Sequence, residues 1–313
     1  MNGRRRPISV ALLGAALLLV TACGGGGGSD AGQDGKGKSD KAEANKPSQA
    51  VVTVAPKDGA GDVATSGALK VSADKGKLTE VKVADSKGNP VEGKLTDSGT
   101  SWTPAHHLAA STKYKVHAVA KDSAGRASAK DSSFTTLTPK NTFVGTFTPE
   151  DGSKVGVGMP FSVRFTRGIT HPEDVEKAIS ITTKPAVDVE GHWFGNDRLD
   201  FRPEKYWAAG TEVTVKMNLD GVEGRDGVYG KQVRTVKFTI GRSQVSTVDA
   251  KKHMMTVERD GKVIKKIPVT TGKPGYETWN GQMVISERLR VTRMNGETVG
   301  YGGEYDIKDV PHA

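Results

Sequence analysis

The strongest constraint on the fold is that one domain-sized pattern occurs twice in the chain. Four short motifs appear in the same order and at a nearly constant spacing in two successive stretches after residue 50. The matching segments are 56–59 with 149–152, 91–93 with 189–191, 108–112 with 207–211, and 134–136 with 238–240. Collinear repetition at this long period indicates two copies of one domain. We assign the copies to residues 51–138 and 139–241.

Each copy has the pattern of a series of short β-strands. Apolar and polar residues alternate along 114–119 and 212–217, as in strands with one buried and one exposed face. Thirty-nine glycines, fourteen prolines and closely spaced turn signals favour an all-β, immunoglobulin-like sandwich over an α/β fold. Because the chain has a single cysteine, no disulfide can join the sheets. The aromatic residues expected in the cores are Trp102, Phe161, Phe165, Trp193 and Phe201.

Residues 1–22 have the form of a bacterial secretory signal. A basic start precedes a mostly apolar run at 8–20, which is too short to span the ~30 Å hydrocarbon core of a membrane. The sequence Val-Thr-Ala-Cys at 20–23 resembles a lipobox, in which the signal is cut before the cysteine and an acyl lipid such as palmitate is attached. We therefore expect Cys23 to anchor the exported protein to the outer face of the membrane, within the cell wall space. The alternative is an ordinary signal followed by a chance cysteine.

Residues 23–50 comprise this cysteine and a tether rich in Gly, Ser and Lys. The tether has no apolar periodicity, which predicts disorder. Residues 32–39 match the phosphate-loop pattern G-x-x-x-x-G-K-S. A working phosphate loop needs a strand before it and a helix after it, and neither pattern is present here. We therefore expect no ATP site.

Charge and histidine placement argue against two other classes of ligand. The formal net charge is +9, but the basic residues are scattered without an aromatic platform, so no nucleic-acid partner is expected. His106 and His107 are adjacent, and adjacent strand residues point to opposite faces. No Cys or carboxylate cluster accompanies them or His192, so no metal is expected.

Residues 244–269 have the pattern of a strand meander, with an Asp260-Gly261 pair suited to a type I′ turn. The meander and the sequences Thr-Thr-Gly-Lys-Pro-Gly at 270–275 and Asn-Gly-Gln-Met-Val-Ile at 280–285 resemble the opening of the L,D-transpeptidase catalytic domain. Residues 277–280 read Glu-Thr-Trp-Asn where that family has Thr-Pro-Thr-Pro. Residues 51–241 likewise resemble the bacterial immunoglobulin-like domains that precede this catalytic domain in actinobacteria.

The resemblance implies an acyltransferase that cross-links peptidoglycan stem peptides without a cofactor. A cysteine thiolate would attack the amide before a terminal D-alanine, a histidine would lower its pKa, and backbone amides would hold the oxyanion. The family's His and Ser-His-Gly-Cys motifs do not occur in residues 242–313, and His312 is not assigned their role. We therefore expect an incomplete, β-rich catalytic domain without catalytic residues, inactive by itself. Tyr305 and Tyr301 are the candidates for lining the substrate pocket.

Two other functions compete with this interpretation. The chain could be a non-enzymatic envelope lipoprotein whose immunoglobulin-like modules bind wall polymer or a protein partner. A solute-binding lipoprotein is disfavoured, because the long βαβ pattern of such folds is absent from the sequence.

Overall fold

The computed structural model describes residues 46–96, 98–285, 288–300, 302–303 and 305–311. The expected signal and Cys23 lie outside the described residues. No helix within these ranges is both long enough and apolar enough to cross a membrane. Three parts follow one another along the chain: module 1 (51–138), module 2 (139–241) and a C-terminal segment (242–313).

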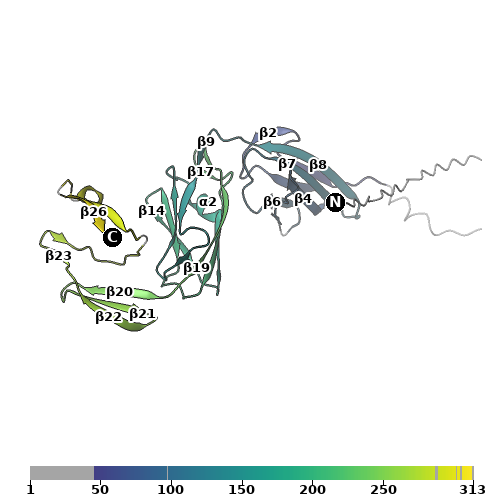
Figure 1. The fold of residues 1–313 in the computed structure, drawn as a ribbon. Coiled ribbons are helices and arrows are strands. Elements are labelled where there is room, and N and C mark those ends of the chain that lie inside the picture. The colour runs from purple at the N-terminus through teal and green to yellow at the C-terminus, as the bar shows by residue number, and fades with distance from the viewer. Residues whose placement is uncertain (1–45, 97, 286–287, 301, 304, 312–313) are drawn as a thin grey trace, which may run out of the picture. The chain divides into compact units, whose positions relative to one another are not determined.

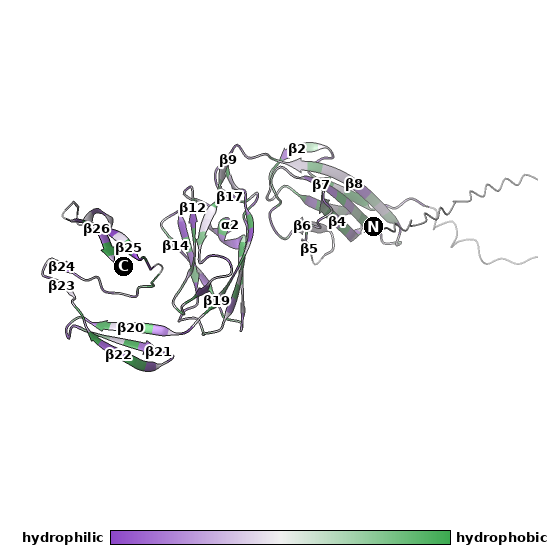
Figure 2. Ribbon diagram, in the orientation of Figure 1, coloured by the Kyte–Doolittle hydropathy of each residue, from purple (hydrophilic) through white to green (hydrophobic). Residues whose placement is uncertain are grey.

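Module 1 is a sandwich of two four-stranded sheets, in the orders β1-β3-β6-β5 and β2-β8-β7-β4 (Figure 1). Its strands are β1 (Val51–Ala55), β2 (Ala60–Val63), β3 (Lys70–Asp74), β4 (Lys77–Asp85), β5 (Gly93–Leu95), β6 (Ser101–Pro104), β7 (Lys113–Lys121) and β8 (Ala127–Thr136). Alternate residues of β7 and β8 face the interior, where Tyr114 lies opposite Phe134 and their ring centroids are 5.5 Å apart. Hydrophobic and hydrophilic residues accordingly share the long strands (Figure 2).

Module 2 repeats this arrangement with the sheets β10-β12-β15-β14 and β11-β19-β16-β13. Its strands are β9 (Asn141–Phe143), β10 (Gly145–Thr148), β11 (Lys154–Val155), β12 (Phe161–Phe165), β13 (Ile179–Lys184), β14 (Glu190–Phe194), β15 (Arg198–Arg202), β16 (Glu212–Asn218), β17 (Glu223–Arg225), β18 (Val228–Gly230) and β19 (Val233–Ile240). A third, small sheet has the order β17-β18-β9. One short helix, α2 (Pro172–Lys177), was not expected from the sequence.

Each module has its own hydrophobic core. Four of the five aromatic residues expected in the cores are buried: Trp102, Phe161, Phe165 and Phe201. Trp193 is only partly buried, because it packs on the outer part of the module 2 core. Its ring stacks on Phe165 at 5.5 Å, and its indole nitrogen donates to Glu176 at 3.3 Å.

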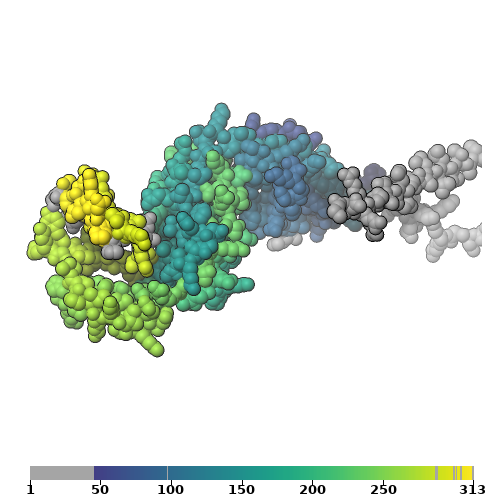
Figure 3. Space-filling view, in the orientation of Figure 1, coloured from purple at the N-terminus to yellow at the C-terminus, as the bar shows by residue number. Residues whose placement is uncertain are grey.

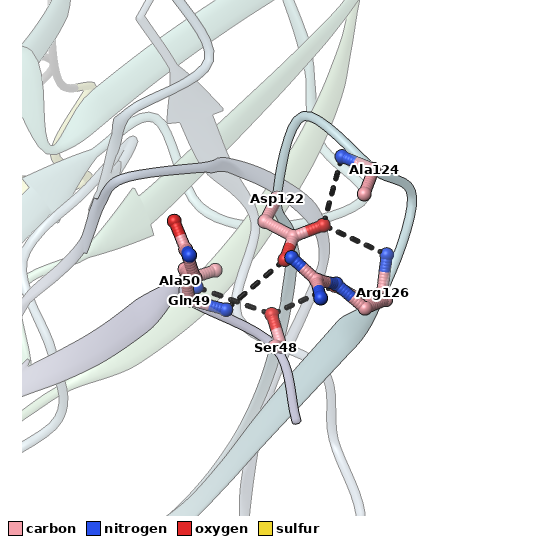
Figure 4. A network of polar contacts seen from close by, with 6 residues as sticks. All are labelled: Ser48, Gln49, Ala50, Asp122, Ala124 and Arg126. Carbon is pink, nitrogen blue, oxygen red and sulfur yellow. Dashed lines mark hydrogen bonds and ion pairs between the residues drawn. The ribbon is translucent and has the colours of Figure 1, made fainter. Parts of the chain in front are cut away.

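Ser48 and Gln49, which the sequence assigned to the tether, make folded contacts with module 1. The Ser48 hydroxyl donates to the Arg126 carbonyl at 2.8 Å, and the Gln49 amide donates to the Asp122 carboxylate at 3.0 Å (Figure 4). Ala50 is buried against the core. The chain is therefore fixed to the β7–β8 turn before β1 begins.

The C-terminal segment consists of small sheets and is not a closed third sandwich. It contains a three-stranded sheet, β20 (Gln244–Asp249), β21 (Met254–Arg259) and β22 (Lys262–Pro268). Two hairpins follow, β23 (Gly272–Lys273) with β24 (Tyr276–Glu277), and β25 (Val291–Asn295) with β26 (Asp306–Pro311), the latter joined by the 3-10 turn η1 (Gly296–Val299). Among the described residues of this segment, Val257 is the only buried apolar side chain.

Candidate functional site

The strand meander predicted at 244–269 is present, and its turn has the predicted geometry. Asp260 and Gly261 both have positive φ, at 49° and 76°, as a type I′ turn requires. The Ser243 amide donates to the Asp260 carboxylate at 3.2 Å, and the Asp260 amide donates to the Ser243 carbonyl at 3.0 Å. These paired contacts close the β21–β22 turn onto the start of β20.

The segment at 270–275, which carries the family resemblance, lies in a tight hairpin formed by β23 and β24. Thr271 is hydrogen bonded through its hydroxyl to His253 Nδ1, 2.8 Å away in the β20–β21 turn. A side chain at Gly272 would place its Cβ 2.1 Å from the Tyr276 carbonyl oxygen, and Gly272 has a φ of 87°. Glycine is therefore required there, since other residues rarely adopt this backbone and none would fit. The Lys273 ammonium lies 4.6 Å from the centre of the Tyr276 ring.

Tyr305, the described member of the predicted substrate pair, lies immediately before β26. Its carbonyl accepts a hydrogen bond of 2.9 Å from the Gly296 amide. Its ring covers Gly296 so closely that an added Cβ there would be 3.2 Å from the nearest ring carbon. The tyrosine is half-buried and held against η1. Tyr301 lies outside the described residues.

An ion pair next to Tyr305 holds the β25–β26 hairpin together. The Arg293 guanidinium donates twice to the Asp306 carboxylate, at 2.5 and 2.6 Å. This pairing lowers the pKa of Asp306 and raises the pKa of Arg293. No sequence signal pointed to the pair, because the two residues are 13 positions apart on strands of unknown register.

The described part of the C-terminal segment contains no cysteine. The chain's cysteine is Cys23, outside the described residues. No cluster of three or more His, Cys, Asp or Glu side chains able to hold a metal is found where the structure is described. The segment therefore offers a scaffold and one candidate substrate-facing ring.

Large apolar side chains are exposed along this scaffold. Trp279, Met283 and Ile285 are 67%, 70% and 75% exposed, unlike the aromatic residues in the module cores. They lie in the region that resembles the passage before the family's catalytic half. In the space-filling view the C-terminal segment carries the green and yellow end of the colour range (Figure 3).

A second candidate surface is the outer face of β10-β12-β15-β14 in module 2. Arg164, Arg198 and Phe194 are cross-strand neighbours in one row of this face. The Arg198 guanidinium lies 4.9 Å from the centre of the Phe194 ring and donates to Asp200 at 2.8 and 2.6 Å. The Asp200 hydrogen bonds raise the pKa of Arg198. Phe194 is half exposed and also contacts the His192 ring at 4.8 Å. The face combines cations with an exposed aromatic ring.

Comparison with known proteins identifies the family of the modules. A family model described as "Bacterial Ig domain" matches residues 60–223, more than half of the chain. The chain belongs to this bacterial Ig domain family. The matched range runs across both Ig modules, each of which has its own core.

The protein is also homologous to mycobacterial L,D-transpeptidases. L,D-transpeptidase 2 of Mycobacterium tuberculosis (strain CDC 1551 / Oshkosh) is 33% identical over 249 residues, covering 80% of this chain and 61% of that protein. L,D-transpeptidase 5 of strain ATCC 25618 / H37Rv is 31% identical over 267 residues, covering 83% and 59%. A structure of the L,D-transpeptidase LdtMt1 in complex with imipenem covers 54% of this chain and 73% of that one, at 26% identity and a TM-score of 0.44. The Ig-domain chain thus spans about three-fifths of the curated relatives' length.

Proposed function

We propose that this chain is the front part of a peptidoglycan L,D-transpeptidase. The observation that carries the proposal is the homology to two curated L,D-transpeptidases over about four-fifths of the chain. The hairpin at 272–277 and the meander before it supply the first strands of the acyltransferase domain. The two Ig modules precede that domain and separate it from the membrane.

The proposed chemistry is acyl transfer through a thioester. A cysteine thiolate attacks the stem-peptide amide carbonyl, the C–N bond breaks, and D-alanine leaves after its nitrogen takes a proton from the paired imidazolium. The amine of a neighbouring stem then attacks the thioester, gives a proton back to the imidazole, forms the new amide and releases the thiolate. The nucleophile motif is not among residues 242–313, so this chain alone is inactive. Tyr305 lines the acyl-donor pocket in the complete domain.

Release of D-alanine from a tetrapeptide stem tests this proposal. We expect none from purified residues 24–313. We expect release from the product of the continued reading frame, and loss of activity when its Ser-His-Gly-Cys cysteine is replaced by serine. In that longer enzyme, Tyr305→Ala should raise KM for the donor more than it lowers kcat, and Tyr305→Phe should be milder. A stop codon directly after Ala313 in the genome would overturn the proposal.

We also propose that the protein is exported and lipid-anchored through Cys23. This rests on the lipobox-like sequence at 20–23. Incorporation of a labelled palmitate analogue in the native host should mark the protein and disappear in Cys23→Ser. The variant should also move from the membrane fraction to the soluble fraction. Unchanged labelling of the variant would contradict anchoring at this residue.

The outer face of module 2 supports a second candidate function, non-catalytic binding of wall polymer. Its arginines suit anionic groups, and Phe194 offers a ring on which a sugar can stack. Co-sedimentation with insoluble peptidoglycan tests this function. Arg164→Gln should weaken binding, whereas Arg234→Gln, an exposed change on the other sheet, should not. Equal binding by both variants would remove the candidate.

A further inference from the structure

The Pro-x-Asp-Gly motif that is repeated at 56–59 and 149–152 makes the same contacts in both modules. In module 1, the Asp58 carboxylate accepts from the Ser133 amide at 2.7 Å, and the Gly59 amide donates to the Ser133 carbonyl at 2.8 Å. Both backbone groups of Ser133, which lies in the last strand of the module, are therefore held by the turn. We call this paired contact a crossing latch, because the chain passes there from one sheet to the other.

Module 2 has the equivalent latch. The Asp151 carboxylate accepts from the Lys237 amide at 2.7 Å, and the Gly152 amide donates to the Lys237 carbonyl at 2.7 Å. Lys237 lies in β19, the last strand of that module. The same four groups thus join the beginning and the end of each module.

After each latch, the chain runs parallel to the last strand of its module. In module 1, β2 pairs with β8, and the Leu137 amide donates to the Val63 carbonyl at 2.9 Å. In module 2, β11 pairs with β19, and the Gly241 amide donates to the Val155 carbonyl at 2.6 Å. These are the two parallel pairings within the four-stranded sheets of the modules, as the structure describes them.

The parallel pairing of β2 with β8, and of β11 with β19, determines how each module responds to a pulling force. A pull on the two ends of the chain draws the paired strands in opposite directions along their common axis. The hydrogen bonds between them lie across that axis, so they are loaded together and must break together. In a hairpin pulled from its open end, the bonds would instead break one at a time.

A second set of contacts fixes the point at which a pull from the N-terminal side reaches module 1. Asp122 accepts from the Gln49 amide and also from the Arg126 side chain at 2.8 Å, and its side chain is 2% exposed (Figure 4). Five residues of β1 then pair with β3 before the chain reaches the latch. Tension must break these contacts before it can peel the first strand away.

We propose that both modules are built to resist tension along the chain. The source of that tension rests on the proposed function, in which one end is held at the membrane and the other works on the wall. Mechanical resistance itself is a property of the modules and can be measured without membrane or wall. It assigns the Ig modules a function beyond separating the catalytic segment from the bilayer.

Single-molecule pulling at constant force tests the proposal on residues 23–313. The chain's one cysteine, Cys23, takes one handle, and a C-terminal tag takes the other. Each module should open in one step that lengthens the chain by roughly 300 Å, given the extended-chain spacing of ~3.3–3.6 Å per residue. Because forced opening is governed by the unfolding rate, lifetimes at a fixed force are the quantity to compare.

The decisive variants are Asp58→Ala and Asp151→Ala, with Asp85→Ala as the matched control. Asp85 accepts two backbone amides within its own turn, at 2.8 and 2.9 Å, and does not contact the last strand. We expect each latch variant to shorten the lifetime of its own module about fivefold, the effect of one net hydrogen bond. The control should change it less than twofold. Asp58→Asn, which keeps an acceptor oxygen for the Ser133 amide, should retain most of the lifetime, and Asp151→Ala carries the test in module 2 if Asp58→Ala does not fold.

Chemical denaturation of the same variants separates mechanical from general effects. The proposal holds if Asp58→Ala and Asp85→Ala lose similar stability in denaturant while only the former opens faster under force. It fails if the two variants open equally fast, or if the unaltered modules open at the forces that separate a hairpin. Neither result depends on lipidation or on acyl transfer. The pulling experiment can therefore fail while the proposed function holds, and the reverse is also possible.

Discussion

Asp122 accepts a hydrogen bond from the amide of Gln49 at 3.0 Å, which joins residues 73 positions apart before the first strand begins. This bond is the first cause of the lowered pKa of Asp122, and the Arg126 amide and side chain also contribute. The carboxylate is almost fully covered by the protein. Protonation of Asp122 should therefore weaken the contact that holds the start of module 1 to the β7–β8 turn.

The stability of module 1 should fall in acid through this group. Because the pKa of Asp122 is lower in the folded state than its unfolded value near 4, its contribution is complete above that value and is lost as pH falls through the folded pKa. Thermal unfolding between pH 6 and 3 should show a smaller decline for Asp122→Asn than for the unaltered protein. The stability of Asp74→Asn, a change at an exposed strand end, should fall with pH as much as that of the unaltered protein. Parallel curves for Asp122→Asn and the unaltered protein would contradict the assignment.

Truncating the centre of the module 2 core should destabilise that module alone. Phe161 is fully buried, and its ring lies 6.1 Å from Phe147 and 6.2 Å from Phe238. We expect Phe161→Ala to lower the unfolding free energy by about 3–5 kcal/mol. Denaturant unfolding should then resolve an earlier module 2 transition, with module 1 unchanged. Phe194→Ala, at a half-exposed ring, should cost less than about 1 kcal/mol.

The hairpin at 272–277 should tolerate substitution of Gly272 less well than substitution of Gly275. Gly272→Ala places a methyl against the Tyr276 carbonyl, whereas the same change at Gly275 meets open space and costs only the positive φ, about 1–2 kcal/mol. Amide NMR shifts of residues 272–277 should collapse toward random-coil values in the first variant and persist in the second. Equal disruption by both would show that backbone strain, not the close approach, decides.

Removing the Arg293 guanidinium should release the pKa of Asp306. Because Arg293 lowers that pKa through two hydrogen bonds, Arg293→Gln should raise it toward the ordinary value near 4. A carbon-13 NMR titration of the Asp306 carboxyl measures the change. Lys308→Gln, on the same strand, is the control and should leave the Asp306 titration in place. If the pKa of Asp306 is unchanged in Arg293→Gln, Arg293 is not the cause of its lowering.

The repeat and the strand periodicity predicted most of the fold, because alternation reports which face of a strand is buried. The Asp260-Gly261 turn was predictable because few residue pairs tolerate two positive φ angles. Helix α2 was missed although Pro172 stands at its first turn, because six residues are too few to show a helical period. The inclusion of Ser48 and Gln49 in module 1 was also missed, because their partners are more than 70 residues away.

The candidate site was less predictable than the fold. Family resemblance directed attention to Tyr305, but its packing on Gly296 depends on how β25 and β26 are aligned. The Arg293–Asp306 pair depends on the same alignment. Sequence periodicity gives the face of a strand and not its register with a partner.

The parallel course of β2 with β8, and of β11 with β19, has a consequence for how such proteins can change over time. A chain that enters and leaves a module in one direction begins at one pole of that module and finishes at the other, so an added copy would place the length of one more module along the path of the chain. Duplication of a whole module would thus adjust the reach of whatever follows in fixed increments.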